Sequence, residues 1–149
     1  MLELANRLEQ TLAAAHPQLA ALTEEAASAR SAQGAWSKKE ELGHLIDSAA
    51  NNHQRFVRLQ NEALLVLPGY AQEEWNRVQH YQERTWTDLI ELWFAYNRHL
   101  AHVIRHADPS RTDNCWRSPK DGDLTLGFIM ADYLSHLNHH LSHILGPQE

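Results

Sequence analysis

Several features that mark other protein classes are scarce in this chain of 149 residues. The single cysteine, Cys115, excludes an internal disulfide framework and a cysteine-based zinc site, so any metal must be held by nitrogen and oxygen. Lys and Arg total 13 without forming a run, and the formal net charge is −6. A surface that follows a phosphate backbone is therefore not expected, and nucleic acid is not a predicted partner.

Long apolar runs are missing as well. No stretch approaches the ~20 apolar residues of a membrane span, and the N-terminal MLELANRLEQ has no basic segment followed by an apolar one. The sequence therefore predicts a soluble, cytoplasmic protein without a membrane partner. Familiar catalytic motifs do not occur either, because GxSxG, a Gly-rich phosphate loop and HExxH are all absent from the sequence.

What the chain does have is helical periodicity. Its six glycines and five prolines fall mostly at the ends of long stretches in which apolar residues recur with a period near 3.6. This pattern predicts an all-α protein, and the length suits one domain over residues 1–149. Long helices are expected at about residues 2–29, 38–61, 87–106 and 125–145. Four such helices predict a four-helix bundle.

Local signals mark the helix ends. Ser37 and Glu40 form a capping-box pattern at the start of the second helix. Thr125 is placed to cap the last helix, which Gly146-Pro147 would stop. Pro17 predicts a kink or a break in the first helix.

The connections before the third and fourth helices are long. The first has a turn at Pro68-Gly69 and then a polar and aromatic stretch through Tyr81, for which a short helix is predicted. The second, from Asp108 to Asp123, is rich in polar residues and is predicted to be a loop. Such connections leave room for crossings between helices that are not neighbours, so simple up-down-up-down order is not required.

Histidine is unusually frequent, with eleven in the chain and four in the segment YLSHLNHHLSHIL. Histidines four apart share one face of a helix, so His136 with His140, or His139 with His143, could bind one ion. At ~100° per residue, His140 and His136 lie about 60° and 100° from the apolar face, whereas His139 and His143 lie roughly 160° and 120° away. The angular positions on the helix therefore favour His136 with His140 as the metal-binding pair.

A third ligand must come from elsewhere, and His44 in the apolar segment GHLID is the best candidate. A buried imidazole needs a partner, although a backbone carbonyl could also provide it. Asp47, Asn51 and Arg55 follow His44 at steps of three and four residues, on the same side of the predicted helix. This polar strip indicates either a pocket or a solvated helix edge.

Three neutral imidazoles leave a first-row divalent ion with open positions, which is the arrangement of a catalytic rather than a structural site. A metal held in this way lowers the pKa of bound water or of a thiol toward neutrality, and so creates a nucleophile. Another cluster, at His99, His102 and His106, lies among hydrophilic neighbours near a helix C-terminus, where cationic residues are favourable. Those three histidines are interpreted as solvent-exposed.

The segments GHLIDSAANNHQRF, WTDLIELWFAYNRHLAHVI and DYLSHLNHHLSHIL together resemble the DinB-like superfamily of metal-dependent enzymes. With Trp36 they span most of the chain, and the DNA polymerase that shares the name is unrelated. The resemblance implies a four-helix bundle with a long crossover and a divalent metal, nickel or zinc, whose three histidine ligands match His44, His136 and His140. It also implies a tendency to form homodimers, which the sequence itself neither supports nor opposes.

Members of that superfamily with an assigned activity are mostly thiol transferases and isomerases that use a low-molecular-weight thiol, and others are named metal-dependent hydrolases. We therefore expect a metal-dependent enzyme that activates a thiol or water for attack on a small electrophilic substrate. Asp47, Asn51 and Arg55 are candidates for orienting ligands or substrate. A metal-dependent hydrolase, a non-catalytic metal- or ligand-binding stress-response bundle, and a structural dimer with incidental histidines are the alternatives. Ring nitrogens about 3 to 4 Å apart would fit shared coordination.

Overall fold

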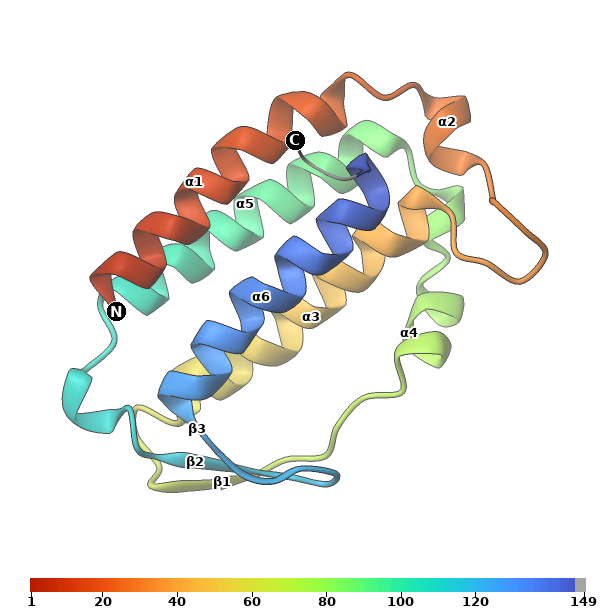
Figure 1. Ribbon diagram of the computed structural model, residues 1–149. Helices are drawn as coiled ribbons and strands as arrows, with labels where there is room; N and C mark the ends of the chain where they lie inside the picture. The colour runs from red at the N-terminus through yellow and green to blue at the C-terminus, as the bar shows by residue number, and fades with distance from the viewer. Residues whose placement is uncertain (147–149) are drawn as a thin grey trace.

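The computed structural model describes residues 1–146, which form a bundle of four long helices with a small sheet at one end (Figure 1). The long helices are α1 (Leu2–Ala20), α3 (Lys38–Arg58), α5 (Trp86–Arg105) and α6 (Leu126–Leu145). Both α1 and α3 pack against α5 and α6. The predicted four-helix bundle is confirmed.

The helices do not follow one another around the bundle. Because α1 and α3 both pack between α5 and α6, they occupy opposite corners, and the chain crosses from one to the other. In Figure 1, α1 and α6 run in one direction, whereas α3 and α5 run in the other. The order is therefore up-down-down-up, with the crossover that the long connections allow. Since α3 and α6 are antiparallel neighbours, the first turns of α3 lie beside the last turns of α6 (Figure 1).

Side-chain caps begin three of the four long helices. The Ser37 hydroxyl accepts a hydrogen bond from the backbone N–H of Glu40, whose carboxylate accepts one from the Ser37 N–H, so the predicted capping box is confirmed. Thr125 caps α6 as expected. The third long helix starts slightly earlier than predicted, because the capping residue is Thr85. Gly146, with φ of 86°, ends α6, while Pro147 lies outside the described residues.

The predicted first helix is in fact two helices. α1 contains Pro17 in its last turn and ends at Ala20, and the chain then turns before the short helix α2 (Glu24–Ser28). Thr23 begins α2, because its side chain accepts a hydrogen bond from the backbone N–H of Ala26. A single helix to residue 29 was therefore a wrong prediction, since the periodicity continued through a new cap.

The connections contain more structure than predicted. The expected short helix is present as α4 (Gln72–Gln79), followed by the 3₁₀ turn η1 (Tyr81–Glu83). The region predicted to be a loop, 108–123, instead holds the 3₁₀ turn η2 (Pro109–Arg111) and most of a hairpin. The strands are β1 (Leu64–Val66), β2 (Cys115–Ser118) and β3 (Gly122–Thr125). The all-α prediction thus holds for the bundle but missed this sheet.

The sheet has the order β1-β2-β3, with β1 parallel to β2 and β2 antiparallel to β3. The hairpin turn contains Asp121-Gly122, and Gly122 has a φ of 77°, which glycine adopts without strain. Trp116 on β2 is buried, and its indole N–H donates to the carbonyl of Leu67. Because β3 leads directly into α6, the sheet that contains β2 lies at the end of the bundle nearest the start of α6 (Figure 1).

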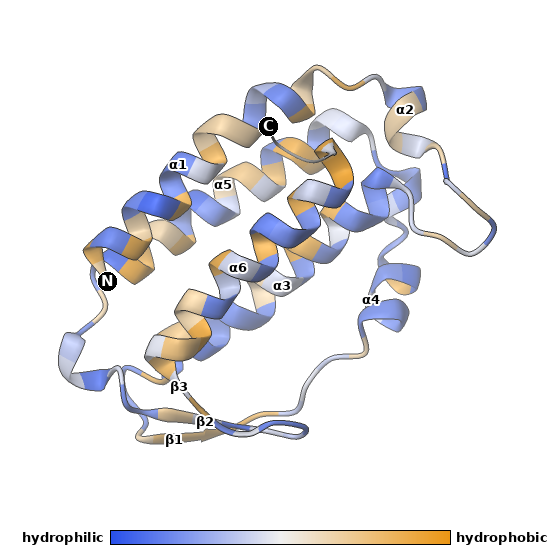
Figure 2. Ribbon diagram, viewed as in Figure 1, coloured by the Kyte–Doolittle hydropathy of each residue, from blue (hydrophilic) through white to orange (hydrophobic). Residues whose placement is uncertain are grey.

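The core lies between the four helices, and each long helix alternates apolar and polar stretches along its length (Figure 2). Trp93 and Phe56 are its largest fully buried side chains. A polar pair also lies within the core: the Tyr133 hydroxyl donates a hydrogen bond to the side-chain oxygen of Asn97, and both residues are buried. Within the described residues, no helix combines the length and the apolar character that crossing a bilayer requires.

Candidate metal centre

Three histidines from two helices meet where α3 and α6 pack side by side. His44 lies in the second turn of α3, and His136 and His140 lie one turn apart in the second half of α6. The Nε2 atoms of His44 and His136 are 3.2 Å apart, and one ring nitrogen from each of the three lies within 4.8 Å of the others. The structure therefore brings together the three histidines proposed from the sequence, at spacings close to those expected for shared coordination.

The outward-facing nitrogens of two of these rings have partners that fix their orientation. The Nδ1 atom of His44 is 3.4 Å from the hydroxyl of Tyr70, and the Nδ1 atom of His140 is 2.6 Å from Oε1 of Glu41. These contacts leave Nε2 of both rings available on the inner side. A hydrogen bond on the second nitrogen is what histidine ligands of metals usually have, because it sets the tautomer and the ring orientation.

The protonation states suit cation binding. Burial lowers the pKa of His44 to about 4, with a further contribution from the neighbouring His140, while Glu41 acts in the opposite sense. Burial likewise lowers the pKa of His136 to about 4, together with the nearby imidazoles. Both rings are thus neutral at pH 7, and only the neutral imidazole binds a metal. The Nδ1 atom of His136 is buried without a hydrogen-bond partner.

Glu41, one turn before His44 on α3, contacts both His140 of the candidate site and the more exposed His143. Its Oε1 atom is also 3.0 Å from Nδ1 of His143, whose side chain is half exposed. Burial disfavours the carboxylate, but hydrogen bonds from His140 and His143 outweigh this effect and lower the pKa of Glu41. The carboxylate is therefore ionised at pH 7 and holds His140 in place. His139, which the helical phase placed on the polar side, is exposed.

A pocket of about 230 Å³ opens beside the histidines. His44 and His136 form part of its wall, and the buried guanidinium of Arg55 and the indole of Trp116 form another part. The remaining lining residues come from α3, α6, β3, the connection before α4 and the first residue of α4: Ser48, Asn52, Tyr70, Gln72, Leu124, Phe128, Ile129, Asp132 and Tyr133. The pocket thus combines candidate metal ligands with a cationic side chain and several hydrogen-bonding groups.

The polar strip on α3 divides between two environments. Arg55 lines the pocket, as does Ser48, but Asp47 and Asn51 are not among the lining residues. The Asp47 carboxylate accepts hydrogen bonds from Tyr81 at 2.6 Å and Gln79 at 2.5 Å, and burial raises its pKa despite them. Asn51 turns back and donates to the backbone carbonyl of Asp47. The Asp47 side chain thus supports the end of α4 and η1, the Asn51 side chain bonds within α3, and neither residue lines the pocket.

Several residues of the site were not identified from the sequence. Glu41, Tyr70, Asn52 and Trp116 each touch a candidate ligand or line the pocket. Glu41 had a local signal, because it lies one turn before His44 on the same helix. Tyr70 and Trp116 had none, since they reach the site from connections whose path depends on the packed bundle.

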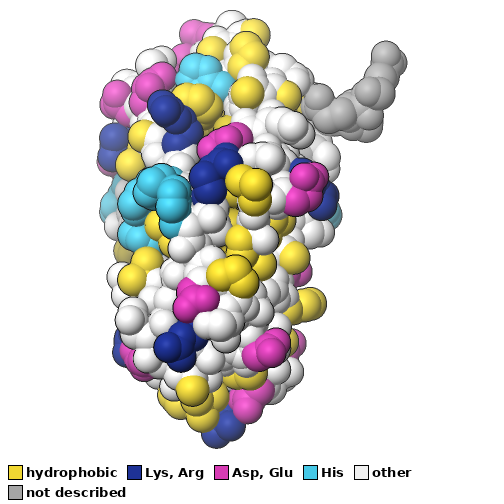
Figure 3. Space-filling view, turned by 90° about the vertical axis from the view of Figure 1, so that its left-hand side faces the viewer, with side chains coloured by type: hydrophobic (Ala, Val, Ile, Leu, Met, Phe, Trp, Pro, Cys, Tyr) yellow, Lys and Arg dark blue, Asp and Glu magenta, His cyan; other side chains and the backbone are white. Residues whose placement is uncertain are grey.

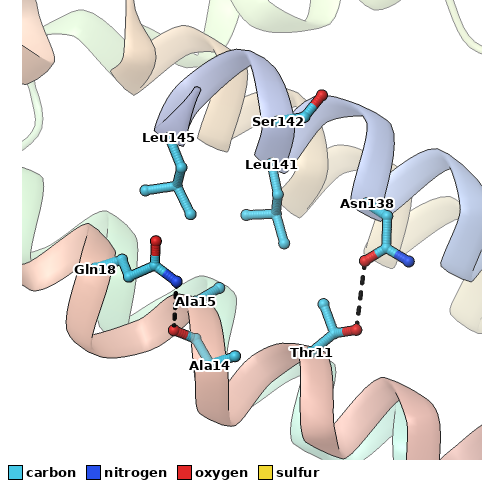
Figure 4. Close-up of a pocket in the computed structure, with 8 residues that line it drawn as sticks. All are labelled: Thr11, Ala14, Ala15, Gln18, Asn138, Leu141, Ser142 and Leu145. Carbon is cyan, nitrogen blue, oxygen red and sulfur yellow. Dashed lines mark hydrogen bonds between the residues drawn. The ribbon is translucent and has the colours of Figure 1, made fainter. Parts of the chain in front are cut away.

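Two other surface features lie away from this centre. A pocket of about 270 Å³ between α1 and α6 is lined by Thr11, Ala14, Ala15, Gln18, Asn138, Leu141, Ser142 and Leu145, none of which is ionisable (Figure 4). His99 and His102 on α5, and His106 at its C-terminal cap, are exposed, as predicted. Figure 3 shows a face of the bundle on which exposed histidines gather beside Lys and Arg side chains, with hydrophobic side chains scattered among polar ones.

Comparison with known proteins places this geometry in context. A protein of Oceanobacillus iheyensis is 26% identical over 111 residues, which are 74% of this chain and 64% of the relative. A protein of Bacillus mycoides is 22% identical over 116 residues, 78% of this chain and 66% of the relative. Both are named "putative metal-dependent hydrolase". The chain therefore spans about two thirds of the length of these relatives or slightly less.

Among solved structures, YfiT from Bacillus subtilis superposes with a TM-score of 0.85 at 19% sequence identity, covering 95% of this chain and 82% of its own. That protein is described as "a probable metal-dependent hydrolase with an unusual four-helix bundle topology". At this identity the likeness establishes a shared fold. The family model of the DinB superfamily matches residues 7–144, and because this match covers most of the sequence, the chain belongs to the DinB superfamily.

Proposed function

We propose that the protein is a metal-dependent hydrolase of small molecules in which His44, His136 and His140 hold a divalent ion. The observation that carries the proposal is the convergence of three imidazoles beside a pocket. Two of them, His44 and His136, are neutral at pH 7. Membership of the DinB superfamily and the names of the relatives support the same conclusion.

The donor set fits a first-row divalent ion with open positions, and nickel or zinc would suit three nitrogen ligands. When bound, such an ion supplies a Lewis acid that makes water or a thiol nucleophilic near neutral pH. Tyr70 and Glu41 hold the outer nitrogens of His44 and His140, so that both rings keep their inner nitrogens directed to the centre. The buried, unpartnered Nδ1 of His136 leaves its Nε2 as the nitrogen that faces His44.

Metal content tests the site directly. Elemental analysis of the wild-type protein should find about one nickel or zinc per chain, and His44→Ala or His136→Ala should remove it, because two imidazoles bind such ions far more weakly than three. His139→Ala is the matched control, since this histidine adjoins His140 but is exposed. Unchanged metal content in the His44 and His136 variants would show that these residues are not the ligands.

Thiol transfer is the second candidate, because the same donor set lowers the pKa of a bound thiol as well as that of water. Two assays of the metal-loaded protein separate the reactions. Release of p-nitrophenol from small esters without added thiol supports hydrolysis. Consumption of an electrophile such as monochlorobimane that requires a low-molecular-weight thiol, and is lost in His136→Ala, supports transfer.

A further inference from the structure

Arg55 is a buried cation without an anionic partner. Only 8% of the residue is exposed, and its polar contacts are a hydrogen bond from Nη1 to Oδ1 of Asn52 at 3.1 Å and the stacking of its guanidinium 3.7 Å from the Trp116 ring centre. No carboxylate among residues 1–146 lies within ion-pair distance of it. Burial of an unpaired charge is costly, and burial lowers the pKa of Arg55 accordingly.

Neighbouring side chains hold the guanidinium of Arg55 in one orientation and leave most of its N–H donors without a hydrogen-bond acceptor. Trp116 covers one face of it, and the Asn52 side chain is itself fixed by a hydrogen bond of 3.0 Å to the Ser48 carbonyl. Asn52 takes one of the five N–H donors of the guanidinium. The group is therefore preorganised for a bidentate acceptor in the pocket, the geometry that carboxylate and phosphate provide.

The pocket has two chemically distinct ends. His44, Ser48, Asn52 and Arg55 follow one another on one side of α3, at steps of four, four and three residues, and all four line the pocket. With a rise of ~1.5 Å per residue, the backbones of His44 and Arg55 are about 16 Å apart. Helical side chains lean toward the N-terminus, so the long Arg55 side chain shortens that distance from its own end.

Other charged groups do not neutralise Arg55. Asp132 is the one carboxylate that lines the pocket, and its side chain is exposed on α6. Tyr70 stays neutral at pH 7, because burial raises its pKa to about 12. The inner end of the pocket thus offers neutral imidazoles, and the other end offers a fixed positive charge.

We propose that this pocket binds an anionic small molecule, whose carboxylate or phosphate group pairs with the Arg55 guanidinium while its reacting group lies beside His44 and His136. The assignment of the reacting end rests on the proposed function. The anion site itself does not, because the contacts of Arg55 are independent of any metal.

Calorimetric titration of the full-length, chelator-treated protein tests the anion site. Succinate and inorganic phosphate serve as separate probes, so the stronger binder identifies the anion, and neutral succinamide should not bind. Arg55→Gln should weaken binding about tenfold or more, as expected for the loss of charged hydrogen bonds. Arg58→Gln is the matched control, because Arg58 lies on the same helix but is only partly buried, does not line the pocket and is paired with Glu62 at 3.1 Å.

Arg55→Lys keeps the charge without the planar fork, so it should fold even if the Gln variant does not, and it should bind the anion less tightly than wild type. Equal affinity in wild type and the Arg55 variants, or no binding of either anion to wild type at millimolar concentration, would overturn the proposal. The His136→Ala variant separates the proposed hydrolase from the proposed anion site. This variant should lose the metal yet still bind the anion after chelation. A protein that binds the anion but holds no metal would refute the hydrolase alone.

Discussion

Replacement of Gly43 by alanine should destabilise the protein, although the same change in most helices is stabilising. Gly43 precedes His44 on α3, where the ring of Tyr81 packs directly on the backbone. A Cβ atom at this position would lie 2.2 Å from Cδ2 and 2.4 Å from Cγ of Tyr81, well inside ordinary van der Waals contact. The ring would have to move by about 1 Å, and its hydroxyl would lose its 2.6 Å hydrogen bond to Asp47.

The expected magnitude follows from three contributions. Overpacking of a buried site costs about 1–3 kcal/mol, and loss of a hydrogen bond to a charged group costs about 1.5–3 kcal/mol. The higher helix propensity of alanine returns about 1 kcal/mol. The free energy of unfolding should therefore fall by about 1.5–5 kcal/mol. Since Tyr81 is only 4% exposed, the ring has little room in which to relax.

Urea unfolding followed by far-UV circular dichroism measures this difference. Gly127→Ala is the control, because a Cβ there would meet Thr112 at an ordinary 3.5 Å, and its stability should stay within about 1 kcal/mol of wild type. In a Tyr81→Ala background, which removes the clashing ring, Gly43→Ala should become neutral or stabilising. If Gly43→Ala were as stable as wild type, or equally harmful in both backgrounds, the steric explanation would be refuted.

Three further predictions concern the site and the core. Glu41→Gln should weaken metal affinity about 10- to 100-fold in a chelator competition assay, because the amide holds His140 less firmly; unchanged affinity would exclude this role. In chelator-treated protein, the unfolding free energy should decrease as the pH falls from about 6.5 to 4, since His44 and His136 protonate more readily in the unfolded chain. Each imidazole should lower the free energy of unfolding by an amount on the order of 3 kcal/mol over this pH range. Urea titrations of His136→Ala should therefore show a shallower decrease of the unfolding free energy with falling pH. Tyr133→Phe should cost about 1–3 kcal/mol in the same assay, because it leaves a buried acceptor on α5 unsatisfied; a neutral effect would contradict this bond.

Much of the helical bundle could be predicted from the sequence because its signals are local. The caps at Ser37 and Thr125 act within three residues, and the apolar period of each helix is set by the geometry of the helix itself. The same geometry separated His136 and His140 from the outward-facing His139. A kink or break was predicted at Pro17, but α1 continues through Pro17 to Ala20, and the new start at Thr23 was missed because apolar residues continued with the same period on both sides of it.

The chemical surroundings of the histidines depend on contacts that no local pattern contains. Glu41 and His140 are 99 positions apart, and Tyr70 reaches His44 from the connection before α4, 26 positions further along the chain. The division of the polar strip was equally hidden, since Asp47 turns to Tyr81 whereas Arg55 lines the pocket.

The sequence by itself determined the four amphipathic helices, their caps and the faces on which the histidines lie, because a helix of period 3.6 assigns each side chain a direction from its position alone. Only the tertiary structure decided that α3 and α6 are antiparallel neighbours and that the sheet brings Trp116 to Arg55. These arrangements arise when the apolar faces of distant segments are buried together, and that burial is a property of the whole chain.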